Sequence, residues 1–203
     1  MKKFISLLLI LSPLLAFAQK TVDQRVEEIL SRMTIEDKLG QLNQMDGRRD
    51  IEKIKQEVRE GTLSSIMNIV DPAVTDELQR IAIEESPSGI PLLFARDVVH
   101  GFNTVLPIPL GMAASWDDEL IEAAAHNTAL EATERGIRWA FAPMMDIARD
   151  PRWGRTEEVF GEDPFLVSEL VVEEIQGMQG DDPTYWRTAT VMKHFLANSN
   201  EDG

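Results

Sequence analysis

The chain has 203 residues, with 20 basic and 35 acidic side chains, a formal net charge of −15 and no cysteine. This negative balance disfavours nucleic acids and anionic membrane surfaces as partners, whereas a neutral small molecule is not repelled. Hydrophobic residues make up 43% of the sequence, which is enough to build a core and excludes a chain that is disordered by composition.

Residues 1–18 have the pattern of a secretory signal peptide. Lys2 and Lys3 are followed by a mainly apolar stretch and then by Ala16-Phe17-Ala18, a small-x-small cleavage sequence. The apolar stretch is too short to favour a membrane span, although a retained N-terminal anchor is the alternative. We therefore expect export across the inner membrane of a bacterium, to the periplasm or the outside, and a folded region over 19–203.

Four short apolar segments, rich in β-branched or aromatic residues, predict buried strands at 64–70, 91–99, 138–147 and 188–196. Helical spacing of apolar residues occurs at 22–44, 51–60, 73–85, 117–135 and 164–176. Within the first of these, Thr34 is expected to cap a second helix, and Gly177 is expected to end the last one. Strands and helices that alternate in this way predict βα units and a parallel sheet.

A complete (β/α)8 barrel takes about 250 residues, and here the fourth predicted strand ends close to residue 203. We therefore expect an α/β fold that corresponds to the N-terminal half of a (β/α)8 TIM-type barrel. A small doubly wound domain is the alternative, but no Gly-rich phosphate loop follows any predicted strand.

In a parallel barrel, functional side chains lie at the carboxyl ends of the strands. This rule selects Asp97 near the end of the second predicted strand, Asp146 in the third, and Lys193 with His194 in the fourth. Because Asp97 and Lys193 interrupt apolar segments, and an unpaired buried charge is costly, we expect both to have partners. A purely structural ion pair would satisfy the same pattern.

The segment 149–163 combines Arg155 and several acids with Trp153 and shows neither helical nor strand periodicity, which predicts an ordered loop. Loops of this kind often carry binding sites, and a solvated loop with internal ion pairs is the alternative. Carboxylates accept hydroxyl protons, basic groups donate to hydroxyl oxygens, and a Trp ring offers an apolar face to a sugar. The candidate set for such a ligand is Asp97, Arg155, Lys193 and His194.

The three histidines give no metal-ligand spacing, so no metal or other cofactor is expected. His100 is interpreted as a hydrogen-bonded packing residue. His126 lies in a predicted helix and is interpreted as a structural or surface residue.

Eight segments in order carry a resemblance to a known family over nearly the whole chain beyond the leader. They are 33–42 (MTIEDKLGQL), 89–94 (GIPLLF), 97–101 (DVVHG), 106–111 (LPIPLG), 114–117 (ASWD), 141–144 (FAPM), 150–163 and 193–195 (KHF). Together they resemble the N-terminal barrel domain of the family 3 glycoside hydrolases, the β-glucosidase and β-xylosidase group.

The resemblance implies retaining hydrolysis of terminal non-reducing β-D-glucosyl or xylosyl residues, with a β-linked oligosaccharide or glycoside as the substrate. It implies that Asp97 binds hydroxyls of the terminal sugar, and that Arg155, Lys193 and His194 bind the same sugar in the −1 subsite. The family's nucleophile and acid/base follow later in the sequence, so both are expected beyond Gly203. No catalytic residue is expected within this chain, and alone it should be inactive.

Family members that are N-acetylglucosaminidases follow the Lys-His-Phe motif with a Pro-Gly-His-Gly loop. Here residues 196–201 are Leu-Ala-Asn-Ser-Asn-Glu, which favours the glucosidase or xylosidase branch. The family often has a non-proline cis peptide near the Lys193-His194 pair, so we expect one here. A non-catalytic carbohydrate-binding protein and an unrelated α/β scaffold are the alternatives.

Overall fold

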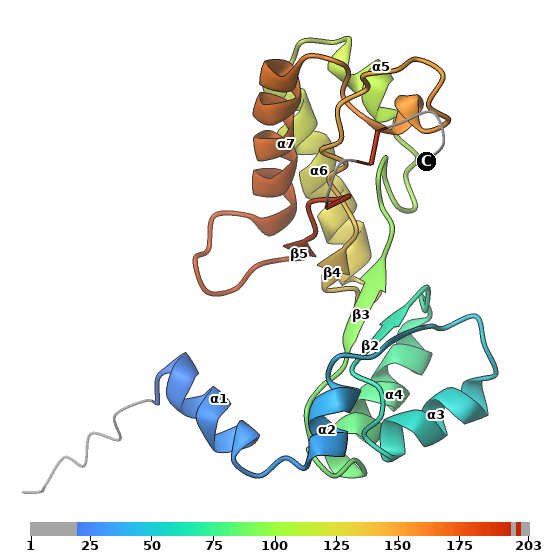
Figure 1. The fold of residues 1–203 in the computed structure, drawn as a ribbon, viewed down its shortest axis with the longest axis vertical. Helices are drawn as coiled ribbons and strands as arrows, with labels where there is room; N and C mark the ends of the chain where they lie inside the picture. Colours follow the sequence, from blue (N-terminus) through green and yellow to red (C-terminus); the bar gives the residue numbers. More distant parts are fainter. Residues whose placement is uncertain (1–19, 196–197, 200–203) are drawn as a thin grey trace, which may run out of the picture. The chain divides into compact units, whose positions relative to one another are not determined.

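The computed structural model describes residues 20–195 and 198–199 (Figure 1). The segment expected to be a signal peptide lies outside these residues, so its assignment stays a prediction. Within the described part, no helix combines the length and the apolar character that crossing a membrane requires.

The chain divides into two compact units, residues 1–33 and residues 34–203. The first unit contributes α1 (Val22–Leu30), which begins with a capping box formed by Thr21 and Gln24 and has no buried residue. All other helices and strands described below belong to the second unit.

The second unit is built on a five-stranded parallel sheet in which the strands follow one another in chain order. The strands are β1 (Gln44–Asp46), β2 (Ser65–Met67), β3 (Leu93–Arg96), β4 (Trp139–Ala140) and β5 (Ala189–Thr190). Since all five run in the same direction, their carboxyl ends lie along one edge of the sheet. The four predicted segments contain β2 to β5, although β4 and β5 are shorter than expected.

Strand β1 was not predicted, because the helix expected over 22–44 covered its first residue. The helical pattern breaks earlier: α2 (Ile35–Gly40) ends at Gly40, where a Cβ atom would lie 2.0 Å from the carbonyl oxygen of Gly61. This close approach brings the chain alongside β2, and the following residues then join the sheet.

The remaining helices are α3 (Ile51–Arg59), α4 (Pro72–Glu84), α5 (Pro109–Ala113), α6 (Asp118–Thr133), α7 (Pro164–Gln179) and the 3₁₀ turn η1 (Thr156–Glu158). Five helices of the second unit begin at a side chain that accepts a backbone N–H, as N-caps do. These caps are Thr34, Asp50, Asp71, Asp117 and Asp163.

The prediction that the last helix ends at Gly177 was wrong. Helix α7 continues to Gln179 and ends at Gly180, which has a positive φ of 75°. Gly177 lies where α7 meets α6, and a Cβ atom there would lie 2.2 Å from the carbonyl oxygen of Glu122. Glycine at position 177 therefore allows the two helices to approach each other, and it does not end α7.

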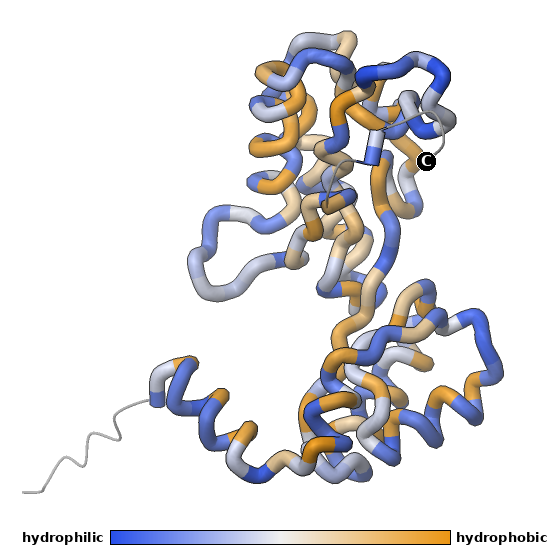
Figure 2. Tube along the Cα trace, viewed as in Figure 1, coloured by the Kyte–Doolittle hydropathy of each residue, from blue (hydrophilic) through white to orange (hydrophobic). Residues whose placement is uncertain are grey.

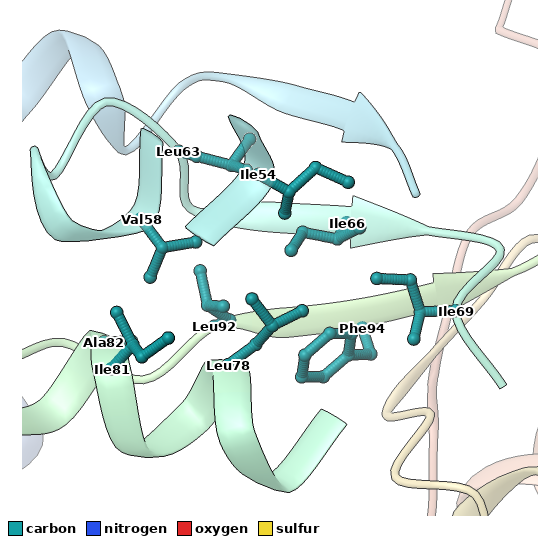
Figure 3. Packing of buried hydrophobic residues seen from close by; sticks show 10 residues of the cluster. All are labelled: Ile54, Val58, Leu63, Ile66, Ile69, Leu78, Ile81, Ala82, Leu92 and Phe94. Atoms are coloured by element: carbon teal, nitrogen blue, oxygen red, sulfur yellow. The ribbon is translucent and has the colours of Figure 1, made fainter. Parts of the chain in front are cut away.

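One face of β2 and β3 packs against α3 and α4 (Figure 3). Ile66 from β2 and Phe94 from β3 are 0% and 1% exposed, and they meet Ile54 of α3 and Leu78 of α4 in the same cluster. Burial of one such side chain contributes about 1.5–3 kcal/mol. This cluster anchors the strand that carries Asp97 at its end.

A second apolar cluster joins α6 and α7 to β4 and to the segment after β3. Four of its six members are alanines, which lets the helices approach the sheet closely: Val98, Ala125, Ala129, Ala140, Ala142 and Met178. Figure 2 shows the hydrophilic residues gathered on the loop around η1. The sheet edge and this polar loop together frame the candidate site.

Candidate active site

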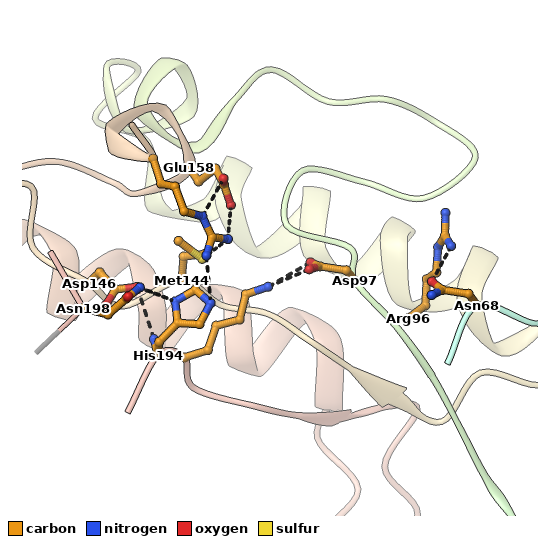
Figure 4. Close-up of polar contacts among 10 residues, drawn as sticks. Asn68, Arg96, Asp97, Met144, Asp146, Glu158, His194 and Asn198 are labelled. Carbon is orange, nitrogen blue, oxygen red and sulfur yellow. Dashed lines mark hydrogen bonds and ion pairs between the residues drawn. The ribbon is translucent and has the colours of Figure 1, made fainter. Parts of the chain in front are cut away.

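Asp97 and Lys193 form an ion pair across the sheet edge, so each of them has the partner that we expected a buried charge to need. The ammonium Nζ of Lys193 donates to both carboxylate oxygens of Asp97 at 2.9 Å (Figure 4). The Lys193 side chain is 10% exposed, whereas the Asp97 side chain is 49% exposed. The carboxylate therefore keeps one side open to solvent, where a ligand hydroxyl can reach it.

His194 is held by the buried carboxylate of Asp146, which follows β4. The Oδ2 atom of Asp146 accepts from the backbone N–H of His194 at 3.1 Å and lies 3.0 Å from the ring Nδ1. The Asp146 side chain is 4% exposed and the His194 side chain 32%. The Nδ1 edge of the ring is thus held by Asp146, while about a third of the side chain stays exposed.

Arg155 reaches the same place from the loop before η1. It donates to Glu158 through Nε at 2.8 Å and through Nη2 at 2.6 Å, and its Nη1 lies 3.1 Å from Nε2 of His194. Nη2 also lies 3.6 Å from the sulfur of Met144. The structure therefore brings Arg155 and His194 together, and the backbone of residues 193–194 places Lys193 beside them.

Each acidic side chain of this cluster contacts a basic one. Glu158 has a lowered pKa, chiefly because its carboxylate is hydrogen-bonded to Arg155, and the same bond raises the pKa of Arg155. Both groups are therefore ionised at neutral pH, and so neither acts as a general acid there. The cluster suits the binding of a neutral, hydroxyl-rich ligand between fixed charges.

The expectation that the loop tryptophan offers a ring face to a sugar was wrong for Trp153. Its side chain is 2% exposed and packs with Met144, Ala148 and Val159. The indole nitrogen has no hydrogen-bond partner among the described residues. Trp153 is the core of the loop, and it holds the backbone that presents Arg155.

The remaining histidines take the structural places that the sequence suggested. The Nδ1 atom of His100 lies 3.2 Å from the carbonyl oxygen of Leu106, and His126 lies within α6. In the described ranges, no three or more His, Asp or Glu side chains come together as a metal site.

An open cavity of about 580 Å³ adjoins the cluster. It shares Asp146 and His194 with the site, and much of its remaining wall is apolar, from Met145, Ile147 and Met192. These apolar walls suit contact with further protein atoms better than contact with a sugar. We therefore place the ligand site at the polar cluster rather than in the whole cavity.

Sequence reasoning missed Glu158 as a part of the site, whereas Asn198 is one of the polar residues that directly follow the fourth predicted strand. Glu158 stands three residues after Arg155, a spacing that can pair the two in one helical turn, and this signal was available. Asn198 places its side-chain amide 3.0 Å from Nδ1 of His194. Asn200 and Glu201, the next polar candidates after the fourth predicted strand, lie outside the described residues. The peptide bond between Lys193 and His194 is cis, as expected.

A parallel α/β sheet with a polar cluster at its carboxyl edge is typical of a barrel-type domain. The N-terminal domain of glycosyl hydrolase family 3 matches residues 34–203, and the chain belongs to this family.

Two relatives show how the match extends over the chain. The periplasmic beta-glucosidase of Salmonella typhimurium is 37% identical over 184 residues, which cover 89% of this chain and 24% of that protein. A putative beta-xylosidase of Formosa agariphila is 31% identical over 81% of this chain and 24% of its own length. The chain thus spans about a quarter of the length of these relatives.

Solved structures agree on the fold. The beta-glucosidase of Listeria innocua in complex with isofagomine has a TM-score of 0.78 and 34% identity, over 88% of this chain and 26% of that one. The exo-1,3/1,4-beta-glucanase of a Pseudoalteromonas species gives a TM-score of 0.76 and 30% identity, over 86% and 25%. The expected fold class, an N-terminal part of a TIM-type barrel, is therefore confirmed.

Proposed function

We propose that this chain forms the −1 sugar-binding part of an exported, retaining β-glycosidase that removes terminal non-reducing β-D-glucosyl or xylosyl residues. The observation that carries the proposal is the convergence of four side chains at one edge of the sheet: Asp97, Arg155, Lys193 and His194. These residues come from three separate strand ends or loops, which matches the way barrel enzymes build their sites.

The roles follow from donors and acceptors. A sugar hydroxyl is both a donor and an acceptor, so a site that mixes carboxylate and basic groups can satisfy both functions. Asp97 would accept hydroxyl protons on its solvent side, and Lys193 and Arg155 would donate to hydroxyl oxygens. Charged hydrogen bonds of this kind are stronger than neutral ones and give directional recognition.

The reacting carboxylates are proposed to come from segments outside these 203 residues. Retaining hydrolysis needs a nucleophile and an acid about 5–5.5 Å apart, and the acid works with a raised pKa. In the described cluster, Asp97 pairs with Lys193, Asp146 with His194, and Glu158 with Arg155. Arg155 lowers the pKa of Glu158, which is opposite to what an acid catalyst needs.

The names of the relatives support the sugar class. Two relatives are named a beta-glucosidase and a putative beta-xylosidase, and the Listeria innocua enzyme has been solved with glucose and, as a mutant, with laminaribiose. One relative is named periplasmic, which supports export together with the leader pattern of residues 1–18.

The test is to express the full-length protein and assay it on aryl β-glucoside and aryl β-xyloside, with the anomer formed first identified by NMR. Release of the β-anomer of either sugar is the expected result, and the ratio of kcat/KM ranks the two sugars. Saturable binding of a sugar without turnover would instead favour the carbohydrate-binding alternative, in which paired carboxylates do no chemistry. Neither binding nor turnover by the folded protein would overturn the proposal.

A further inference from the structure

Asp146 has the most deeply buried side chain among the charged groups of the cluster. Only 4% of its side chain is exposed, so its oxygens need hydrogen-bond partners within the protein. It receives the backbone N–H of His194, and its Oδ2 lies 3.0 Å from Nδ1 of the same ring. A carboxylate in this position favours a proton on Nδ1.

Arg155 imposes the same choice from the opposite side of the ring. A guanidinium has only donors, and its Nη1 lies 3.1 Å from Nε2 of His194. Nε2 must therefore offer its lone pair, because an N–H at this atom would face another N–H. Two independent contacts thus select one neutral form of His194, with the proton on Nδ1 and an acceptor at Nε2.

Asn198 is consistent with this choice once its amide is oriented by the network. Its side-chain amide lies 3.0 Å from Nδ1, and the nitrogen and oxygen of an amide exchange places by a half turn. With the oxygen toward the ring, Asn198 shares the proton that Nδ1 donates to Asp146. The opposite proton placement would set Nε2–H against Arg155.

Glu158 fixes the direction of Arg155 in turn. It takes Nε and Nη2 in a bidentate contact at 2.8 and 2.6 Å, which leaves Nη1 pointing to His194. Nη1 carries two hydrogens, and His194 uses one of them. One donor of Nη1 therefore stays available beside the acceptor Nε2.

We propose that Asp146 and Glu158 are positioning residues, which set Nε2 of His194 and Nη1 of Arg155 as an acceptor and a donor for one ligand hydroxyl. The inference rests on the proposed function, since it assigns a polarity to the proposed sugar site. The two nitrogens are 3.1 Å apart, so one hydroxyl oxygen can contact both. Because Nε2 has a single lone pair, the proton of that hydroxyl takes the place of the Nη1 hydrogen at Nε2, while the hydroxyl oxygen accepts from Nη1.

Substrate analogues can test which partner donates and which accepts at this hydroxyl. A fluorine in place of a hydroxyl keeps an acceptor but has no proton to donate. At the hydroxyl bound by His194, a deoxyfluoro glycoside should therefore lose about as much kcat/KM as the deoxy glycoside. Both losses should be about tenfold or more, because neither analogue brings the proton that Nε2 accepts from the parent hydroxyl.

The variants that test the inference are Asp146→Ala and Glu158→Gln in the full-length protein, with Asp146→Asn as the conservative replacement. Ala removes the acceptor beside Nδ1, whereas Asn can keep an oxygen in the place of Oδ2, because that atom also accepts the backbone N–H of His194. We expect Asp146→Ala to lower kcat/KM about tenfold or more and to shift the His194 ring away from a single form with the proton on Nδ1, and Asp146→Asn to restore that form and most of the activity. Glu158→Gln should raise KM with the His194 form unchanged, because it loosens Arg155 only.

The readout is the ¹⁵N chemical shifts of the His194 ring, assigned by comparison with His194→Gln, alongside kinetics on the deoxy and deoxyfluoro series. Asp150→Asn is the matched control, because Asp150 pairs with Arg152 in the same loop and does not contact the cluster. It should leave the ring shifts unchanged and kcat/KM within about twofold of the value for the parent protein.

A wild-type ring protonated on Nε2, or an Asp146→Ala variant with unchanged ring shifts and kinetics, would overturn the inference. Because the ring shifts need no substrate, they test the inference even if no glycoside is hydrolysed. Failure of the proposed function would appear separately, as wild-type protein that carries the expected His194 form but neither binds nor cleaves a sugar.

Discussion

The ammonium of Lys193 donates to both oxygens of Asp97, but water reaches the two partners very unequally. The side chain of Lys193 is 10% exposed and that of Asp97 is 49% exposed. Removing one partner therefore leaves a different group behind in each case. In one variant it is an enclosed cation, and in the other a carboxylate that water can solvate.

This inequality predicts that Asp97→Asn destabilises the protein more than Lys193→Met does. The first variant leaves the enclosed Lys193 without its counter-ion and should lower the free energy of unfolding by about 1–3 kcal/mol. The second leaves a carboxylate in contact with water and should cost less than about 1 kcal/mol. Denaturant titration of both variants checks the order, and a larger loss for Lys193→Met would contradict it.

Replacement of Arg155 is predicted to weaken the reaction more than it weakens the fold. Arg155→Ala should lower kcat/KM about 10²-fold, because a charged hydrogen bond to a hydroxyl is lost. This corresponds to a few kcal/mol of transition-state stabilisation. Arg155→Lys should recover part of this, since it keeps the charge but loses the bidentate contact with Glu158. Arg152→Ala is the control on the same loop, where its side chain is 70% exposed. Unchanged kinetics in a folded Arg155→Ala variant would remove Arg155 from the site.

Glu174 of α7 is predicted to make the protein less stable as the pH rises. Burial, partly offset by Lys193, raises the pKa of its carboxyl to about 8 from the usual 4.5. The unfolded chain ionises above about pH 4.5 while the folded chain stays protonated, so the free energy of unfolding falls between these two values. The loss reaches about 3 kcal/mol at pH 7.

Glu174→Gln removes this dependence, because a neutral amide has no proton to release. The stability of the variant relative to the parent should rise between pH 4 and pH 7 by about the same 3 kcal/mol. Denaturant titrations of both proteins at several pH values measure the difference. A constant difference across this range would show that Glu174 has an ordinary pKa in the folded protein.

Gly177→Ala is predicted to destabilise the contact between α6 and α7. The new Cβ would lie 2.2 Å from the carbonyl oxygen of Glu122 and 2.8 Å from Cβ of Ala125, so the two helices must separate. Such overpacking costs about 1–3 kcal/mol, more than the helix propensity gained by alanine. Gly111→Ala in α5 is the control, because its Cβ would meet only ordinary contacts at 3.7 Å. A thermal midpoint of Gly177→Ala at or above the parent's would refute this account.

The sequence predicted α1 to α4, α6, α7 and four strands because apolar periodicity is a local signal, but it did not predict the short helix α5. It missed β1, a three-residue strand of Gln44–Asp46 with no fully buried side chain, because its place depends on the pairing with β2. The exposure of Trp153 was also beyond local reasoning. A tryptophan between charged residues looks exposed in sequence, but it is buried because the loop folds back over it.

The pairings inside the site were the least predictable part. The rule that buried charges need partners identified Asp97 and Lys193, but it did not say that they would pair with each other across 96 residues. The contact of Asp146 with His194 likewise depends on the register of β4 against β5, which fixes which strand-end residues face one another. Contacts between residues so far apart in the sequence depend on how the whole sheet is assembled.

The chain-order sheet has a consequence for how the protein is made. Each strand from β2 to β5 pairs with the strand synthesised just before it, so a nascent chain finds its partner already present. The cluster of Figure 3 can form while Lys193 and His194 are still in the ribosome. The polar cluster should therefore assemble in a single step, as β5 joins the sheet and the two basic residues reach Asp97 and Arg155.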